Sequence, residues 1–124
     1  MKYFSKKKCI LKDGEIFYKI GGKGPPLLMI HGYPQTHYMW NLIAPKLAEK
    51  YTLILPDLRG YGKSFAPKGH SDHSNYSKRV MGSDLKTLMN QLKFQKFCIV
   101  GHDRGGRVAH RMARDNPKDI VGLV

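Results

Sequence analysis

The sequence lacks any apolar run long enough to cross a membrane. It has 124 residues, and no stretch of about 18 consecutive apolar residues occurs in it. The charged N-terminus is not followed by an apolar stretch, which does not fit a secretory signal. Only two cysteines occur, Cys9 and Cys98. We expect two free thiols in a cytoplasmic chain rather than one disulfide.

Acidic residues are scarce as well. Nine Asp and Glu oppose 22 Lys and Arg, which gives a formal net charge of +13. The basic residues are spread along the chain without interleaved aromatics, so we expect a solvated basic surface and neither nucleic acid nor membrane as partner. A positive field would still attract a small anionic substrate. A content of 41% hydrophobic and 25% charged residues is typical of one globular domain.

Buried strands alternate with amphipathic helices along most of the chain. Two β-type runs flank Asp13-Gly14, a strong hairpin signal. Because strand and helix alternate from Leu27 onward, the fold class is α/β, with a three-layer and mostly parallel sheet. Pro45 is expected to begin a second helical piece or to kink the first. The expected strands are 27–30, 52–55, 97–100 and 120–124, and the expected helices are 36–50, about 77–92 and 104–116.

The segment Gly-His-Asp-Arg-Gly-Gly at 101–106 follows a strand and opens a helix, which is the setting of a nucleophile elbow. Its central residue is Asp103. A carboxylate is ionised at neutral pH and suits displacement at saturated carbon, which gives an ester on the enzyme that an activated water then hydrolyses. The alternative is that Asp103 only caps the helix. Capping does not explain the flanking glycines, since Gly101 and Gly105 suit a turn in which a side chain would collide.

Residues 31–34, which follow the first buried strand, are the expected second half of the site. In such folds this turn supplies one backbone N–H of an oxyanion hole, and the residue after the nucleophile supplies the other. The two donors would be the N–H groups of Tyr33 and Arg104. The alternative is a plain strand-to-loop turn.

Arg104 and Arg107 share one face of the helix that follows. Cations in a first helical turn oppose the helix dipole, so helix formation does not explain them. A pocket for an anionic substrate does, because arginine grips a carboxylate with two hydrogen bonds. The alternative is that Arg104 pairs with Asp103 while Arg107 is solvated.

Three segments together resemble the α/β-hydrolase superfamily, and within it most of all the haloacetate (fluoroacetate) dehalogenases. They are 31–35 with Trp40 beyond it, 57–64, and 101–107. The third is the most specific, because related families usually place tryptophan after the nucleophile. The resemblance implies that Asp103 is the nucleophile and that Arg104 and Arg107 hold the substrate carboxylate. It implies no metal and no organic cofactor.

The resemblance also implies an incomplete enzyme. In this superfamily the acid and the histidine follow the nucleophile in the chain. Residues 1–124 would then be the N-terminal portion of the core domain, truncated after the strand that follows the nucleophile helix, without the cap domain and the C-terminal core. A complementary C-terminal hydrolase fragment is therefore a candidate partner. The rival hypotheses are an epoxide hydrolase-like fragment and a non-catalytic remnant that binds anions.

No local histidine is expected to act as the missing base. His110 lies about 10 Å along the helix axis from Asp103 at about 1.5 Å per residue. His102 should point away from the nucleophile, and His31 is expected to brace its loop. Asp57 and the arginine two residues on, Arg59, are expected to brace the loop after their strand.

Overall fold

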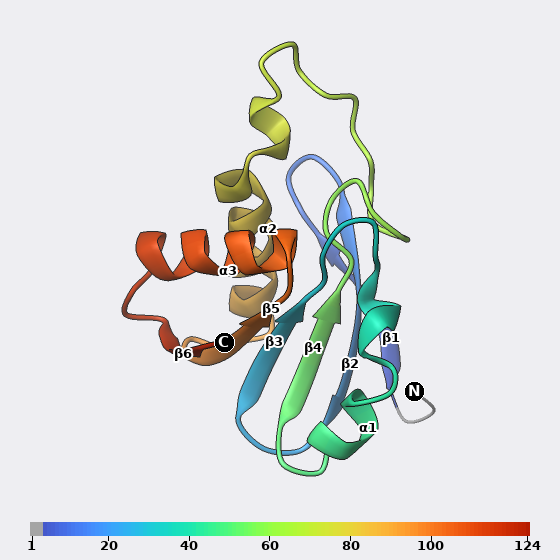
Figure 1. Cartoon of the computed structure of the whole chain (residues 1–124), viewed down its shortest axis with the longest axis vertical. Coiled ribbons are helices and arrows are strands. Elements are labelled where there is room, and N and C mark those ends of the chain that lie inside the picture. Colours follow the sequence, from blue (N-terminus) through green and yellow to red (C-terminus); the bar gives the residue numbers. More distant parts are fainter. Residues whose placement is uncertain (1–3) are drawn as a thin grey trace.

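Six strands form one mixed sheet in the computed structural model, which describes residues 4–124 (Figure 1). The spatial order is β1-β2-β4-β3-β5-β6. The hairpin of β1 and β2 is antiparallel, and β2 joins β4 antiparallel, whereas β4, β3, β5 and β6 run parallel. The predicted hairpin and the predicted α/β sheet are thus confirmed. The strands are β1 Ser5–Ile10, β2 Glu15–Gly22, β3 Pro26–Ile30, β4 Thr52–Pro56, β5 Phe97–Gly101 and β6 Ile120–Leu123.

Helices cover both faces of this sheet and complete the three layers. Alternate residues of each central strand face opposite sides, so Leu28 packs in the cluster with α2 and α3, while Leu27 packs in the cluster with α1. Burial on both faces explains the continuous apolar runs of β3 and β4. The helical elements are η1 His37–Trp40, α1 Ala44–Leu47, η2 Ser74–Tyr76, α2 Lys78–Gln91 and α3 Arg104–Asp115.

The helical segment expected over 36–50 is divided, and Pro45 begins its second piece, which is one of the two outcomes expected of this proline. The segment forms the short 3-10 helix η1, a turn, and then α1, with Pro45 in the first turn of α1 as its fixed φ favours. Ile43 is 48% exposed, whereas Trp40 and Ala44 are buried against the sheet. The two pieces thus pack on the sheet separately, η1 through Trp40 and α1 through Ala44.

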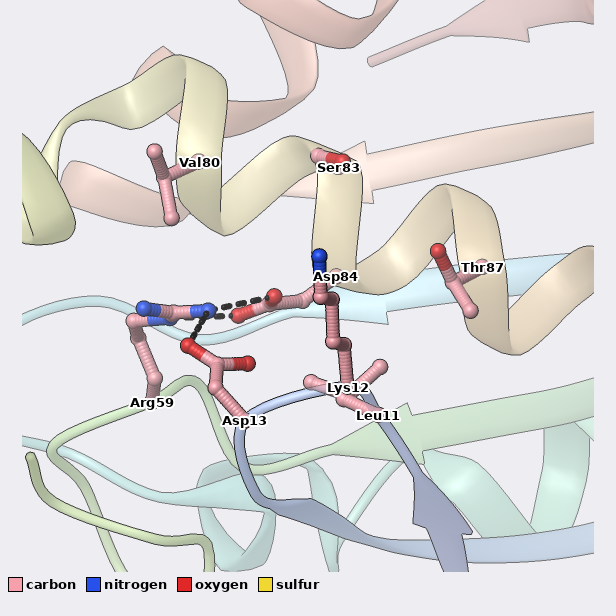
Figure 2. A pocket seen from close by; sticks show the side chains of 8 residues that line it. All are labelled: Leu11, Lys12, Asp13, Arg59, Val80, Ser83, Asp84 and Thr87. Atoms are coloured by element: carbon pink, nitrogen blue, oxygen red, sulfur yellow. Dashed lines mark hydrogen bonds and ion pairs between the residues drawn. The ribbon is translucent and has the colours of Figure 1, made fainter.

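The loop after β4 is tied to α2 and to the β1–β2 hairpin by Arg59, as expected of a bracing residue (Figure 2). Arg59 is 4% exposed, and its Nε and Nη2 each donate to the Asp84 carboxylate over 2.7 Å. Nη2 also lies 3.5 Å from the carboxylate of Asp13 in the hairpin turn. A cavity of about 580 Å³ opens beside these groups. The ion pairs fix three separate segments in place.

The direction of chain progression reverses at β3. The chain leaves β3 for β4 on one side, and β5 lies on the other side. At such a switch point the loops after neighbouring parallel strands diverge and leave a crevice where ligands bind in open α/β sheets. The loops after β3 and β5 meet there, and the N–H of His102 donates to the carbonyl of Ile30 over 3.1 Å.

Glycine permits this close approach of the loop after β3 to α3. A Cβ on Gly105 would lie 2.3 Å from the carbonyl oxygens of both Ile30 and His31, which no side chain can occupy. A Cβ on Gly101 would lie 2.5 Å from the Gly105 carbonyl oxygen. The expectation that side chains would collide at these two positions is confirmed.

None of the helices described in residues 4–124 is both long and apolar enough to cross a membrane.

Candidate active site

Asp103 lies on a strained bend between β5 and α3. Its backbone has φ 56° and ψ −120°, a combination that costs energy for any residue with a side chain. The side chain is exposed and makes no capping hydrogen bond to α3. Helix capping is therefore not the reason for an aspartate here, and the expected elbow geometry is present.

Backbone N–H groups face the Asp103 carboxylate. The N–H of Tyr33 donates to Oδ2 over 3.0 Å. The N–H groups of Tyr33 and then Arg104 hold the pKa of Asp103 below its ordinary value, because both favour the charged form. A Cβ on Gly32 would lie 2.6 Å from the Cβ of Asp103, so the two loops are in close contact. The carboxylate is ionised at neutral pH, and it faces the two N–H groups predicted for an oxyanion hole.

The two arginines next to Asp103 are not paired with it. The Arg104 guanidinium lies 4.5 Å from the ring centroid of Tyr33, and its Nη1 donates to the hydroxyl of Tyr61 over 3.3 Å. Arg107 is exposed, and its positive charge also favours the ionised form of Asp103. In the part of the chain that the structure describes, neither arginine forms an ion pair with a carboxylate. The alternative of an Arg104–Asp103 ion pair is therefore contradicted.

A cavity of about 330 Å³ adjoins this elbow and shares Tyr33 and Arg104 with it. The sequence interpretation missed it, because its walls come from the loop after β3, the loop after β4, and the starts of α2 and α3. No local motif signals such an assembly. The lining residues are Tyr33, Gly60, Tyr61, Ala66, Tyr76, Lys78, Met81 and Arg104.

His31 braces its loop, as expected. It is fully buried, and its Nε2 accepts the N–H of Leu58 over 3.0 Å. Its Nδ1 must then carry the proton and donate to the carbonyl of Gly32 over 2.9 Å. Burial lowers the pKa of His31, so the ring is neutral. With both ring nitrogens engaged, His31 is a structural residue.

A buried pair of His37 and Asp57 is the feature that the sequence did not place. Asp57 is 0% exposed, and it accepts the His37 N–H over 2.7 Å, the His37 Nδ1–H over 2.8 Å and the Lys63 N–H over 3.0 Å. Burial alone would raise the pKa of Asp57, but the hydrogen bonds from His37 and Lys63 outweigh it and leave the pKa below its ordinary value. The expected bracing role of Asp57 is confirmed.

No histidine within residues 4–124 is hydrogen-bonded to Asp103. The same residues contain no group of three His, Cys, Asp or Glu side chains placed to hold a metal ion. Cys9 and Cys98 are both free thiols, as expected. The site therefore consists of one carboxylate, two backbone N–H groups and nearby cations.

The family follows from a comparison with known proteins. A family model described as alpha/beta hydrolase fold matches residues 25–124. The chain belongs to this family. It is 49% identical over 120 residues to a fluoroacetate dehalogenase from Burkholderia sp, and 42% identical over 114 residues to a soluble epoxide hydrolase from Corynebacterium sp. (strain C12). The alignments cover 97% and 92% of this chain.

A solved structure has the same fold. The crystal structure of a putative alpha/beta hydrolase from Nostoc sp PCC 7120 superposes with a TM-score of 0.96 at 47% identity over 98% of this chain. The chain covers 42% of that protein, and 40% and 38% of the two curated relatives. It thus spans about two fifths of the length of these members of the alpha/beta hydrolase family.

Proposed function

We propose that this alpha/beta hydrolase chain acts on small 2-haloacids, with Asp103 displacing the halide. One observation carries the proposal: an exposed, ionised carboxylate stands on a strained elbow, facing two backbone N–H groups and flanked by two arginines that form no ion pair within residues 4–124. The similarity to a fluoroacetate dehalogenase supports it.

In the first step, one oxygen of the Asp103 carboxylate attacks the carbon that bears the halogen. A C–O bond forms as the C–halogen bond breaks, and the halide leaves with the bonding electron pair. Arg104 and Arg107 hold the carboxylate of the substrate so that the carbon faces Asp103. The product is an ester between Asp103 and the 2-hydroxyacid skeleton.

In the second step, water adds to the ester carbonyl carbon, Cγ of Asp103. The proton of the water passes to a histidine, and the N–H groups of Tyr33 and Arg104 stabilise the resulting oxyanion. Collapse of this intermediate breaks the bond from Cγ to the substrate oxygen. The 2-hydroxyacid leaves with the proton returned by the histidine. The second proton of the water is released to solvent from the Asp103 carboxyl group, which restores the carboxylate.

We propose that a complementary C-terminal hydrolase segment supplies this histidine and its acid. An apolar cavity of about 300 Å³ supports a further segment, since it lies against β5 and β6 and is lined by Cys98, Val100 and Leu123 among others. Val124 also lines this cavity and is 84% exposed. Residues 1–124 alone would form the ester and stop there.

Epoxide hydrolysis is the second candidate, because a soluble epoxide hydrolase is 42% identical. An aspartate nucleophile serves both reactions. The cations Arg104 and Arg107 favour the acid, since an epoxide carries no carboxylate for them to bind. If bromoacetate esterifies Asp103 and styrene oxide does not, the substrate is a haloacid and not an epoxide. If anions bind saturably and no covalent adduct forms, the chain is a non-catalytic binding module.

Bromide release from bromoacetate tests the proposal. We expect a burst of at most one equivalent of bromide per chain. The background is measured with the Asp103→Asn variant, because its unchanged thiols release bromide as those of the wild type do. Arg107→Ala should slow the burst about tenfold, because a charge-assisted contact to the substrate is lost. Equal bromide release by the wild type and Asp103→Asn would overturn the proposal.

A further inference from the structure

The cavity beside Asp103 is larger than a haloacetate needs. Its volume of about 330 Å³ equals that of roughly ten waters at about 30 Å³ each. A two-carbon haloacid has about five non-hydrogen atoms, fewer than the roughly ten waters that this volume could hold. The remaining space extends from Arg104 towards Tyr76, Lys78 and Met81. A longer substrate fits this shape better than acetate derivatives do.

Lys78 lies where helix stability does not require it. It is the first residue of α2, directly after Ser77, whose side chain caps the helix by accepting the N–H of Val80. A cation at a helix N-terminus opposes the helix dipole. Arg104 holds the same position in α3. Two helices thus begin with a cation beside the same cavity. An anion bound in the cavity would offset the unfavourable charge at the start of both helices.

The charges around the cavity and the elbow do not balance. Lys78, Arg104 and Arg107 are positive, and the lining of the cavity contains no carboxylate. Burial and then the charges of Arg104 and Arg107 hold the pKa of Lys78 below its ordinary value. Asp103 supplies one negative charge, which leaves a net charge of two positive units. A substrate with two carboxylates would neutralise it.

We propose that Lys78 binds a second anionic group of the substrate, and that the site prefers dianionic 2-haloacids, such as 2-halosuccinates, to haloacetate. One carboxylate lies between Arg104 and Arg107 next to Asp103. The carbon chain crosses the cavity along the rings of Tyr61 and Tyr76, and the second carboxylate accepts hydrogen bonds from Nζ of Lys78. The catalytic part of this inference rests on the proposed function, whereas the binding part does not.

Calorimetry on the whole chain at constant ionic strength tests the inference, with succinate as the dianion and acetate as the monoanion. The variants are Lys78→Gln and, as a matched control, Lys46→Gln, which removes the same charge from an exposed position in α1. We expect succinate to bind about tenfold more tightly than acetate to the wild type and to Lys46→Gln. In Lys78→Gln the two affinities should differ by less than about twofold, with acetate unchanged. An unchanged circular dichroism spectrum and urea midpoint establish that Lys78→Gln is folded.

Equal affinities for succinate and acetate in the wild type would overturn the inference. So would a succinate preference that survives in Lys78→Gln, or one that is lost equally in Lys46→Gln. Esterification by bromoacetate is measured in parallel, since it needs Asp103 but not Lys78. If no ester forms while the Lys78-dependent preference persists, the proposed function fails and the dianion site stands. If the ester forms but the wild type binds succinate and acetate equally, the dianion site fails and the proposed function stands.

Discussion

Two aspartates follow parallel strands of the same sheet, and their surroundings are opposite. Asp57 follows β4 directly, is 0% exposed, and accepts three hydrogen bonds from His37 and Lys63. Asp103 follows β5 after one intervening residue, is exposed, and faces the backbone N–H groups of Tyr33 and Arg104. Both carboxyl groups have a lowered pKa. Both are therefore ionised at neutral pH, but only Asp103 is accessible to a substrate.

The difference shows that ionisation alone does not make a carboxylate available to a substrate. Hydrogen bonds from side chain and backbone occupy Asp57 and make it a brace between the loops after β3 and β4. At Asp103 the strained backbone presents the carboxylate outward, and the donors that face it are those of the proposed oxyanion hole. Burial, hydrogen-bond partners and backbone conformation thus give one chemical group two different surroundings.

The largest expected effect is that of Asp57→Ala on stability. Removal of the carboxylate leaves the two buried donors of His37 and the partly buried backbone N–H of Lys63 without an acceptor, and this should lower the free energy of unfolding by about 3–5 kcal/mol. Urea denaturation measures it. Asp103→Ala is the control, because no buried partner depends on that side chain. Equal losses of stability in the two variants would contradict the view that Asp57 braces the fold whereas Asp103 does not.

The second largest effect is expected at the contact between the elbow and the loop after β3. In Gly105→Ala the new Cβ would meet the carbonyl oxygens of Ile30 and His31, at an expected cost of about 1–3 kcal/mol. The neighbouring Gly106 is the matched control, because its nearest contact would be at 3.5 Å. Gly106→Ala should stabilise α3 by about 0.5–1 kcal/mol. Thermal denaturation measures both variants. Equal shifts of the two melting temperatures would contradict the packing described for Gly105.

Low pH should weaken the stabilising hydrogen bonds that Asp57 accepts. Because the pKa of Asp57 is lowered in the folded state, its contribution to stability is complete above its unfolded pKa of about 3.9 and is lost as the pH falls through its folded pKa. Urea midpoints measured between about pH 2 and pH 6 should therefore fall less steeply in acid for Asp57→Asn than for the wild type. Parallel curves would show that Asp57 does not titrate in this way.

The smallest expected effect is a gain in stability from Asp103→Gly. Glycine adopts φ 56° and ψ −120° more readily than aspartate, so the substitution should relieve strain, while the greater freedom of glycine in the unfolded chain opposes the gain. We expect a slightly higher urea midpoint. A clear decrease would mean that the Asp103 side chain stabilises the fold.

The sequence predicted the parts of the molecule that local pattern controls. Short continuous apolar runs placed the strands, and the glycines around Asp103 predicted the elbow. For the segment 36–50 the sequence left open whether Pro45 kinks one helix or begins a second piece. The second outcome is found, with Trp40 and Ala44 packed on the sheet. The His37–Asp57 pair and the position of Lys78 join residues from separate elements. Only the folded chain brings such residues together.

A peptide map after reaction with bromoacetate tests most directly whether Asp103 is the nucleophile. We expect one carboxymethyl group, located by tandem mass spectrometry on Asp103 and released by hydroxylamine as an ester is, with Asp57 unmodified. Alkylation confined to Cys98 or to histidines, stable to hydroxylamine and equal in Asp103→Asn, would contradict this role.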